Sequence, residues 1–167
     1  LYHPVVICRN CGLIQAMLRM DESSYTDFYE EEYRLLYDGT DAWQKAQFDS
    51  QFERATAIDD YLVDGDRQDT SILDIGSGPG GMLAYFQQKG HPVAGCDLDA
   101  SAVDYGQSQG VPVQRASIHE LELEWDPSIV ILSHIVEHFL DPIQDLKTIR
   151  ELGSPDTRYF VEVPGVK

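Results

Sequence analysis

The stretch SILDIGSGPGGMLAYF, residues 71–86, decides how this chain folds. It begins with a short apolar run typical of a strand, passes through a glycine-rich segment at residues 76–81, and continues with apolar residues at helical spacing. Glycines between a strand and a helix allow positive φ angles and let a ligand approach the backbone. The helix amino terminus beyond them offers free N–H groups and the positive end of the helix dipole. The stretch therefore predicts a strand, a ligand-binding loop and a helix, in that order.

The chain after residue 86 continues this alternation of strands and helices. We expect further strands at residues 92–96, 111–114, 128–133 and 159–163, and helices that begin near Asp41, Ser101 and Asp141 and end near residues 64–66, Gly110 and Gly153. Such alternation predicts an α/β fold with right-handed crossovers and helices on both faces of a parallel sheet. We expect a Rossmann-like, doubly wound sheet with strand order 3-2-1-4-5 and a ligand site at the carboxyl ends of the strands.

Two acidic residues near the glycines indicate the kind of ligand. The glycine spacing alone is ambiguous, because it fits Gly-x-Gly-x-Gly through Gly80 and the dinucleotide pattern Gly-x-Gly-x-x-Gly through Gly81. Asp97 ends the second strand, 21 residues after Gly76, where its two oxygens could accept both hydroxyls of a ribose. Asp74, inside the first strand, would repel a pyrophosphate and attract an ammonium group. Together they favour a nucleoside ligand that carries an ammonium group over a dinucleotide.

A cluster of titratable residues follows the fourth expected strand. His134, Glu137 and His138 are spaced i, i+3 and i+4, so on a helical turn they would share one face. Next to a ligand pocket, such a cluster could include a general base, although Glu137 and His138 could equally be structural. The spacing also matches the zinc-protease pattern His-x-x-Glu-His, but Asp141 and Pro142 would end that helix too early.

Three motifs in this order resemble those of class I methyltransferases that use S-adenosylmethionine. They are LDIGSGPG at residues 73–80, GCDLD at 95–99 and ILSHIVEHFLDP at 131–142, and the resemblance covers about residues 40–164. It implies a cofactor site that includes Asp74, Gly76, Ser77, Gly78, Gly80, Asp97, Leu98, Ser117, Ile118, Ser133 and His134. In this set Asp97 would bind the ribose, Ser117 and Ile118 would lie against the adenine, and Ser133 and His134 would line the methionine portion. Ser117 stands where many relatives have Asp.

The resemblance also leads us to expect catalytic and structural features. Candidate catalytic residues are His138, Glu137 and His134. The complete fold of these enzymes has seven strands, so we expect this five-strand chain to lack the final hairpin that borders the substrate pocket. We expect S-adenosylmethionine-dependent methyl transfer to a small-molecule or sugar-type acceptor. The alternatives are a non-catalytic S-adenosylmethionine-binding scaffold and a nicotinamide-dependent oxidoreductase, which Asp74 disfavours.

The amino-terminal segment contains a second kind of motif. Cys8 and Cys11, followed by Gly12 and Leu13, resemble one knuckle of the zinc ribbon found in sugar C-methyltransferases. One cysteine pair supplies two of the four ligands that structural zinc requires, so the resemblance implies zinc only in a longer protein that has a second pair. We therefore divide the chain into a partial zinc-ribbon-like segment at residues 1–22, a helical or lid segment at 23–66 and the cofactor-binding core at 67–167. The tyrosines at 25–37 could form a lid or an interface.

Composition narrows the partners and the location. The net charge is −17, and no basic stripe offsets it, so we expect no nucleic-acid partner. No apolar run approaches the ~20 residues of a membrane-spanning helix, and we expect no membrane partner and a cytoplasmic protein. Three cysteines make no disulfide framework, and Cys96 is expected to be a buried thiol. The acid excess fits either a protein that works at high salt or an ordinary acidic protein. The oligomeric state stays open.

Overall fold

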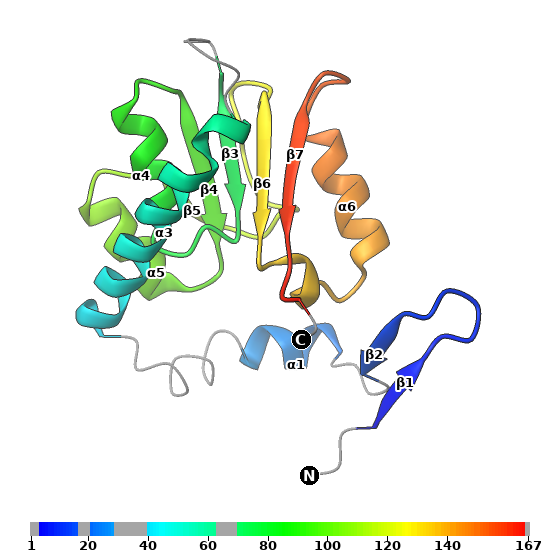
Figure 1. Ribbon diagram of the computed structural model, residues 1–167. Coiled ribbons are helices and arrows are strands. Elements are labelled where there is room, and N and C mark those ends of the chain that lie inside the picture. The colour runs from blue at the N-terminus through cyan, green and yellow to red at the C-terminus, as the bar shows by residue number, and fades with distance from the viewer. Residues whose placement is uncertain (1–3, 17–20, 29–39, 63–69, 166–167) are drawn as a thin grey trace.

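A computed structural model of the protein describes residues 4–16, 21–28, 40–62 and 70–165, and shows a central parallel sheet (Figure 1). Its five strands lie in the order β5-β4-β3-β6-β7. Their bounds are β3 Ile72–Ile75, β4 Val93–Asp97, β5 Val113–Arg115, β6 Ile129–Ser133 and β7 Arg158–Glu162. Every pairing among them is parallel. Counted along the chain from β3, this is the order 3-2-1-4-5, and the predicted Rossmann-like fold is confirmed.

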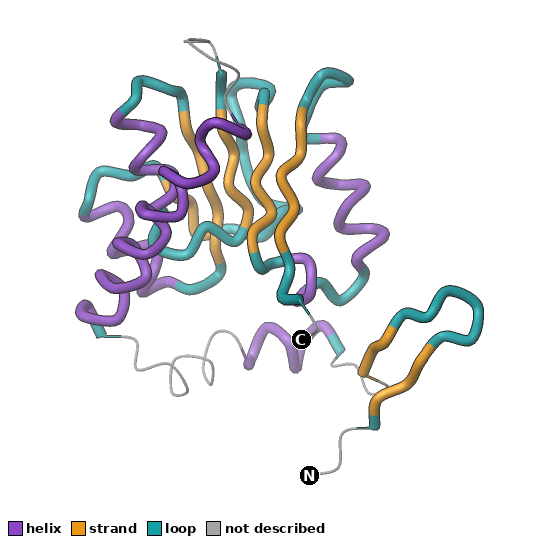
Figure 2. The backbone as a smooth tube through the Cα atoms, in the orientation of Figure 1, coloured by secondary structure: helices purple, strands orange, loops and turns teal. Residues whose placement is uncertain are grey.

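Helices cover both faces of the sheet (Figures 1 and 2). Three of them, α3 Asp41–Leu62, α4 Gly81–Gln88 and α5 Ala100–Ser108, lie on one face, and α6 Pro142–Glu151 lies on the other. The side chains of β6 alternate between the two cores: Ile129 and Ile131 face the three helices, and Val130 and Leu132 face α6. Because both faces are covered, this strand is an unbroken apolar run, as the sequence predicted.

Side-chain caps begin α3, α5 and α6, and two of these caps differ from the expected residue. Asp141 caps α6 as predicted, since its carboxylate accepts from the Gln144 N–H at 3.1 Å. At α5, however, Asp99 is the cap and accepts from the Ser101 N–H at 2.9 Å. At α3 the Thr40 hydroxyl accepts from the Trp43 N–H at 3.3 Å, so Asp41 is already inside the helix. In both cases the capping residue lies one or two positions earlier than predicted.

The edge of the sheet at β7 presents apolar side chains to solvent. Ile143, Leu146 and Ile149 recur at helical spacing and form the apolar stripe of α6, but Ile143 is 69% exposed and Leu146 40% exposed, and only Ile149 is buried. Within the described residues β7 pairs with β6 alone, and its Tyr159 and Val161 are exposed as well. The stripe is partly uncovered because the described part of the chain places no element beyond β7 to cover it.

The amino-terminal segment forms separate small elements. Strands β1 Val5–Ile7 and β2 Ile14–Ala16 make an antiparallel hairpin, and α1 spans Glu22–Asp27. Most of the tyrosine-rich lid segment, including residues 29–39, lies outside the described residues. Helix α3, which we placed in the 23–66 segment, adds Ala55 and Leu62 to the core against the sheet. Among the described helices, none is long and apolar enough to span a bilayer.

Candidate functional site

The glycine loop adopts a conformation that only glycine accommodates easily. Gly76, Gly78 and Gly80 have φ angles of 70°, 54° and 77°, all in the left-handed region. A Cβ atom on Gly76 would lie 2.7 Å from the side chain of Ile135. The backbone N–H groups of Gly76 and Ser77 donate to the Cys96 carbonyl at 2.9 and 3.1 Å. The loop is therefore tied to the end of β4 and closely covered by the segment that follows β6.

Helix α3 is docked directly onto this loop through Gln51. Its amide nitrogen donates to the Ser77 carbonyl at 3.1 Å, and its amide oxygen accepts from the Gly81 N–H at 2.9 Å. A Cβ atom on Gly81 would lie 2.0 Å from the backbone oxygen of Phe48. Gly81 is thus required by the packing of α3 against α4, which explains the third glycine of the dinucleotide-like spacing without a ligand.

Asp97 lies at the end of β4 with its carboxylate held by the backbone. Its oxygens accept from the Gly78 N–H at 2.7 Å and from the Asp99 N–H at 2.8 Å. Burial raises the pKa of this carboxyl, while these two hydrogen bonds oppose the increase. A carboxylate has about four lone-pair positions, so these hydrogen bonds leave acceptor capacity for a ligand hydroxyl. Leu98, the next residue, is 37% exposed and offers an apolar surface beside them.

Asp74 is the most perturbed acid near the loop. Its side chain is 4% exposed, and burial, reinforced by the negative charge of Asp97, raises its pKa to about 8. The positive charge of Arg54 opposes this increase. A carboxyl group in this state would be stabilised in its charged form by a cationic group of a ligand. This fits the ammonium group expected from the sequence.

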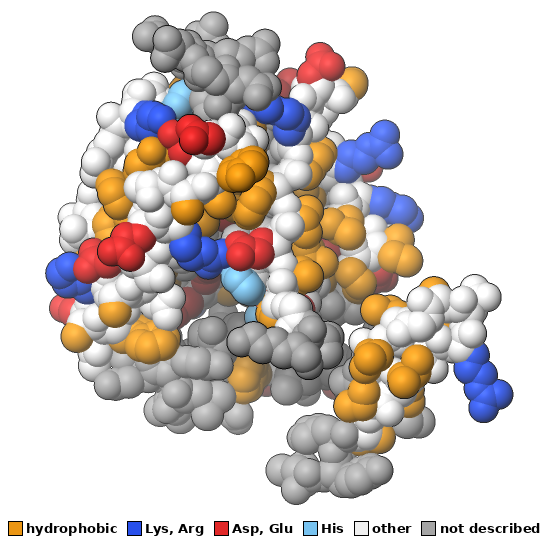
Figure 3. Space-filling model, viewed as in Figure 1, with side chains coloured by type: hydrophobic (Ala, Val, Ile, Leu, Met, Phe, Trp, Pro, Cys, Tyr) orange, Lys and Arg blue, Asp and Glu red, His pale blue; other side chains and the backbone are white. Residues whose placement is uncertain are grey.

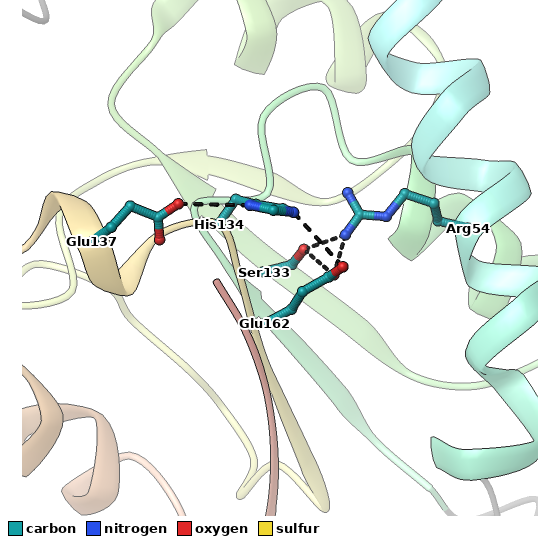
Figure 4. A network of polar contacts seen from close by, with 5 residues as sticks. All are labelled: Arg54, Ser133, His134, Glu137 and Glu162. Carbon is teal, nitrogen blue, oxygen red and sulfur yellow. Dashed lines mark hydrogen bonds and ion pairs between the residues drawn. The ribbon is translucent and has the colours of Figure 1, made fainter. Parts of the chain in front are cut away.

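A network of polar side chains lies at the carboxyl ends of β6 and β7 (Figure 4). Arg54 reaches over from α3, donates to the Ser133 hydroxyl at 2.8 Å and forms an ion pair with Glu162. The Ser133 hydroxyl donates to Glu162 at 3.1 Å. The two imidazole nitrogens of His134 lie 3.6 Å from a Glu137 oxygen and 3.7 Å from a Glu162 oxygen. Figure 3 shows basic, acidic and histidine side chains adjoining on this face of the molecule.

His134 adopts an unusual backbone conformation at the centre of this network. Its φ angle is 55°, and it is the only non-glycine residue with positive φ among those described. Its N–H donates to the Glu162 carbonyl at 2.8 Å, which holds the turn against β7. The expected helical face is instead a short 3-10 turn, Val136–His138, and it brings Glu137 to His134. His138 is exposed on that turn, and its N–H donates to the Ile135 carbonyl at 2.9 Å.

Two contributors to the site were missing from the sequence-based prediction, Arg54 and Glu162. A signal for Arg54 was available, because Gln51 and Arg54 recur at helical spacing beside Phe48, Phe52 and Ala55, on the face that packs inward. Polar residues on a buried face suggest a specific partner. Glu162 had no such signal, since a single polar residue near the end of an expected strand is ordinary.

The residues predicted to lie against an adenine occupy the segment after β5. The Ser117 hydroxyl donates to Glu120 at 2.8 Å, and this bond lowers the pKa of the Glu120 carboxyl. Ile118 packs against the core beneath α6. Cys96 is buried as predicted, and burial raises the pKa of its thiol to about 12, so it is a packing residue.

The cysteine pair lies in the turn of the amino-terminal hairpin. The Cys8 N–H donates to the Leu13 carbonyl at 2.8 Å, and Gly12, with φ of 76°, donates to the Cys8 carbonyl at 2.9 Å. Backbone N–H groups of Cys11 and Asn10, together with the Cys11 thiol, stabilise the Cys8 thiolate and lower its pKa. In the described part of the chain, no group of three or more Cys, His, Asp or Glu residues is placed to hold a metal. The pair supplies half of a ligand set.

Comparison with known proteins supports the assignment of the fold. A plantazolicin methyltransferase (BpumL) in complex with SAH superposes with a TM-score of 0.57 at 18% identity, covering 78% of this chain and 52% of that one. DesVI of Streptomyces venezuelae gives 0.55 at 18% identity, with 88% and 59% covered. Magnesium protoporphyrin IX methyltransferase (ChlM) of Synechocystis PCC 6803, with bound SAM, gives 0.58 at 15% identity, with 84% and 75% covered.

The chain therefore spans just over half the length of the first two structures. None of the curated proteins matches it in sequence. The family profile described as "Methyltransferase domain", by contrast, matches residues 42–167, from the start of α3 through the sheet and the polar network. This match covers three quarters of the chain, and with the fold and the loop geometry it shows that the chain belongs to the methyltransferase domain family.

Proposed function

We propose that the chain binds S-adenosylmethionine at the glycine loop and supports methyl transfer to a small-molecule or sugar-type acceptor. The observation that carries this proposal is the pair of carboxylates on neighbouring strands, buried Asp74 and partly buried Asp97, on either side of a loop with three left-handed glycines. A nucleoside with an ammonium group satisfies both carboxylates. The pyrophosphate of a dinucleotide would place a further negative charge beside them.

Each part of the site has a role in this proposal. Asp97 accepts the ribose hydroxyls, and Asp74 receives the ammonium group. Gly76, Ser77, Gly78 and Gly80 let the ligand approach the backbone, and Leu98, Ser117 and Ile118 border the adenine. Ser133 and His134 line the methionine portion. In support, two of the structures with the same fold were crystallised with SAH or SAM.

The cofactor would supply a methyl group activated by a sulfonium, and the protein would align the acceptor and remove its proton. His134 is the first candidate proton acceptor, because its imidazole follows the carboxyl end of β6 and lies between Glu137 and Glu162, 3.6 and 3.7 Å from their oxygens. A carboxylate that faces an imidazole fixes its orientation and stabilises its charged form. His138, on the same turn, is the second candidate. A non-catalytic cofactor-binding scaffold is the alternative, and turnover with candidate acceptors decides between the two.

Cys8 and Cys11 belong to a separate proposal. Within a longer protein that contributes two further ligands, this knuckle would complete a structural zinc site, and the stabilised Cys8 thiolate fits that role. It requires no zinc at the site of methyl transfer.

Titration calorimetry with SAH, S-adenosylmethionine and NAD tests the proposal. We expect SAH to bind in the micromolar range, about −8 kcal/mol, and NAD to bind far more weakly. Asp97→Ala should weaken the binding of SAH by roughly 1–3 kcal/mol, because charge-assisted hydrogen bonds to the ligand are lost. Asp104→Ala, which removes an exposed carboxylate from α5, is the matched control and should change nothing. Unchanged SAH affinity in the Asp97 variant, or preferential binding of NAD, would refute the assignment.

A further inference from the structure

We propose that a groove at the amino ends of β4 and β5 is a docking surface for a segment of a partner protein in which basic and apolar residues are mixed. The groove has a volume of about 1060 Å³ and is lined by the first residues of the two strands, by residues 121–126 and by the end of α6. Asp97 lies at the other end of β4, so the groove is separate from the glycine loop (Figure 1). The inference is therefore independent of the proposed function.

One side of the groove is a short segment with a regular pattern. Residues 121–126 have the sequence LELEWD, in which apolar and acidic side chains alternate. Leu121 is buried, and Leu123 and Trp125 are partly buried and pack against the core beneath α6. The three acids of the segment are exposed: Glu122, Glu124 and Asp126. The segment thus turns its apolar side chains onto the core and its carboxylates toward solvent.

The backbone of this segment is held near both of its ends. The Gln114 side-chain amide donates to the Glu122 carbonyl at 2.8 Å, and the Ser71 hydroxyl donates to the Asp126 carbonyl at 3.0 Å. Pro127, the next residue, is fully buried. A surface that is already ordered loses little conformational freedom when a partner binds. The segment therefore presents its carboxylates from a prearranged backbone.

The charge of the groove indicates the chemistry of the partner. Glu151, at the end of α6, adds a fourth carboxylate to the lining, and no lysine, arginine or histidine of the described residues contributes to it. None of the four carboxylates forms an ion pair with another described residue. A surface of this kind attracts positive groups and repels phosphate. It disfavours nucleic acids and anionic membrane surfaces and favours a basic segment.

Apolar side chains in the same groove favour a peptide segment over a simple polyamine. Val93, Leu123, Trp125 and Leu152 all line the groove, and each is partly exposed. Covering them with apolar side chains is favourable by about 25 cal/mol per Å². The volume also exceeds the ~300–1000 Å³ of sites for drug-sized ligands, so several side chains fit. A segment that mixes Lys or Arg with apolar residues satisfies both the carboxylates and the apolar lining.

Fluorescence titration with a synthetic peptide tests this docking surface, because one of the two tryptophans of the chain lines the groove. In a Trp43→Phe background, Trp125 is the sole reporter. The probe is the peptide KVKVKVK, and the matched peptides are EVEVEVE, with the charge reversed, and KSKSKSK, without apolar residues. We expect KVKVKVK to change the Trp125 emission saturably and to bind at least about tenfold more tightly than either matched peptide. Raising NaCl from about 0.1 to 0.5 M should weaken this binding.

Substitution of the acids separates the groove from the net charge of the chain. The triple variant Glu122→Gln, Glu124→Gln, Asp126→Asn should weaken the binding of KVKVKVK at least about tenfold. The matched control is Glu53→Gln, Asp60→Asn, Asp104→Asn, which removes the same charge from exposed positions of α3 and α5 on the opposite face of the sheet. This control should change the affinity by less than about twofold. An unaltered Trp125 emission without peptide shows that each variant is folded.

Four results would overturn the proposal. Equal loss of affinity in the two triple variants would mean that the peptide follows net charge alone. Equal binding of KSKSKSK would assign the groove to simple cations. A change in Trp125 emission with protein concentration alone would assign the groove to a second copy of the chain. The absence of a saturable change with KVKVKVK would show that no such segment docks there.

Discussion

The two halves of the candidate site are held in different ways. The glycine loop and Asp97 are fixed by backbone N–H groups, with Gly78 donating to Asp97 at 2.7 Å and the loop tied to β4. The other half consists of partly exposed side chains from α3, β6, β7 and the turn after β6, and its Arg54–Glu162 pair joins residues 108 positions apart. A backbone-bonded region keeps its geometry without a ligand, whereas exposed ion pairs rearrange at low cost. We therefore expect the loop half to fix the nucleoside and the side-chain half to respond to binding and to chemistry.

The sharpest way to separate the two halves is to substitute His134. His134→Asn should lower turnover by about 100-fold or more, because general base catalysis contributes at this scale, and leave SAH affinity within about threefold. Activity measured beside calorimetry checks both. His138→Asn is the matched variant on the same turn and should lower turnover less than His134→Asn does. A larger loss in the His138 variant would assign the proton acceptor to His138 instead.

Asp74→Asn should have opposite effects on binding and on stability. SAH affinity should fall about 10–100-fold, because the ammonium loses its charged partner. The pKa of Asp74 is raised to about 8 in the folded protein, whereas in the unfolded chain it lies near 4. Between these two pH values the native state keeps a proton that the unfolded chain has released. Stability therefore falls as pH rises from about 4 to 8, and removing the carboxyl should raise the free energy of unfolding at pH 8 by about 2–5 kcal/mol.

Denaturant titrations of the wild type and the Asp74 variant at pH 5 and pH 8 check the second effect. The stabilisation should be large at pH 8 and small at pH 5, where the wild-type carboxyl is protonated in the native state. An equal difference at both pH values would show that packing around the amide, and not the charge of Asp74, causes it.

Ligand binding to the unmodified chain should depend on pH in the opposite direction to stability. The ammonium of SAH favours the charged form of Asp74, so binding below about pH 8 releases a proton and SAH binds more tightly from pH 6 to pH 8. We expect a gain of several-fold, up to tenfold per pH unit. Calorimetry in buffers of different ionisation enthalpy measures the released proton. Asp74→Asn should release none, and 5′-methylthioadenosine, without the ammonium, should show no such dependence.

The smallest expected effect is at Gln51, which connects α3 to the loop. Gln51→Ala removes both hydrogen bonds to the loop and should lower the free energy of unfolding by about 1–2 kcal/mol. The substitution should weaken the binding of SAH and of 5′-methylthioadenosine by a similar small factor, since the binding of both ligands depends on the loop. If Gln51→Ala weakened the binding of SAH alone, Gln51 would belong to the side-chain half of the site, and the distinction between the two halves would not hold.

The two halves also differ in how well the sequence predicts them. The loop, Asp74 and Asp97 lie within residues 74–97, and their roles follow from local patterns of glycine, strand and helix. Arg54 and Glu162 meet only because α3 crosses the strand ends, and one-dimensional spacing contains no record of that crossing. The same limit applies to the exposure of α6. Helical spacing correctly predicts its apolar stripe, but spacing cannot show that the described chain leaves part of that stripe uncovered. His134 was identified from its position, yet its left-handed backbone was not predictable.

The contact between Gly81 and Phe48 has a consequence for how this chain can change. The atom that would collide with a methyl group at position 81 is a main-chain oxygen, 2.0 Å away, and not part of the phenylalanine ring. No replacement of Phe48 can therefore make room, and second-site suppressors at position 48 should not rescue Gly81→Ala. Only a shift of the whole helix could, and it would carry Gln51 and Arg54 away from the strand ends. A residue that touches no ligand in our proposal would then be as intolerant of substitution as those that do.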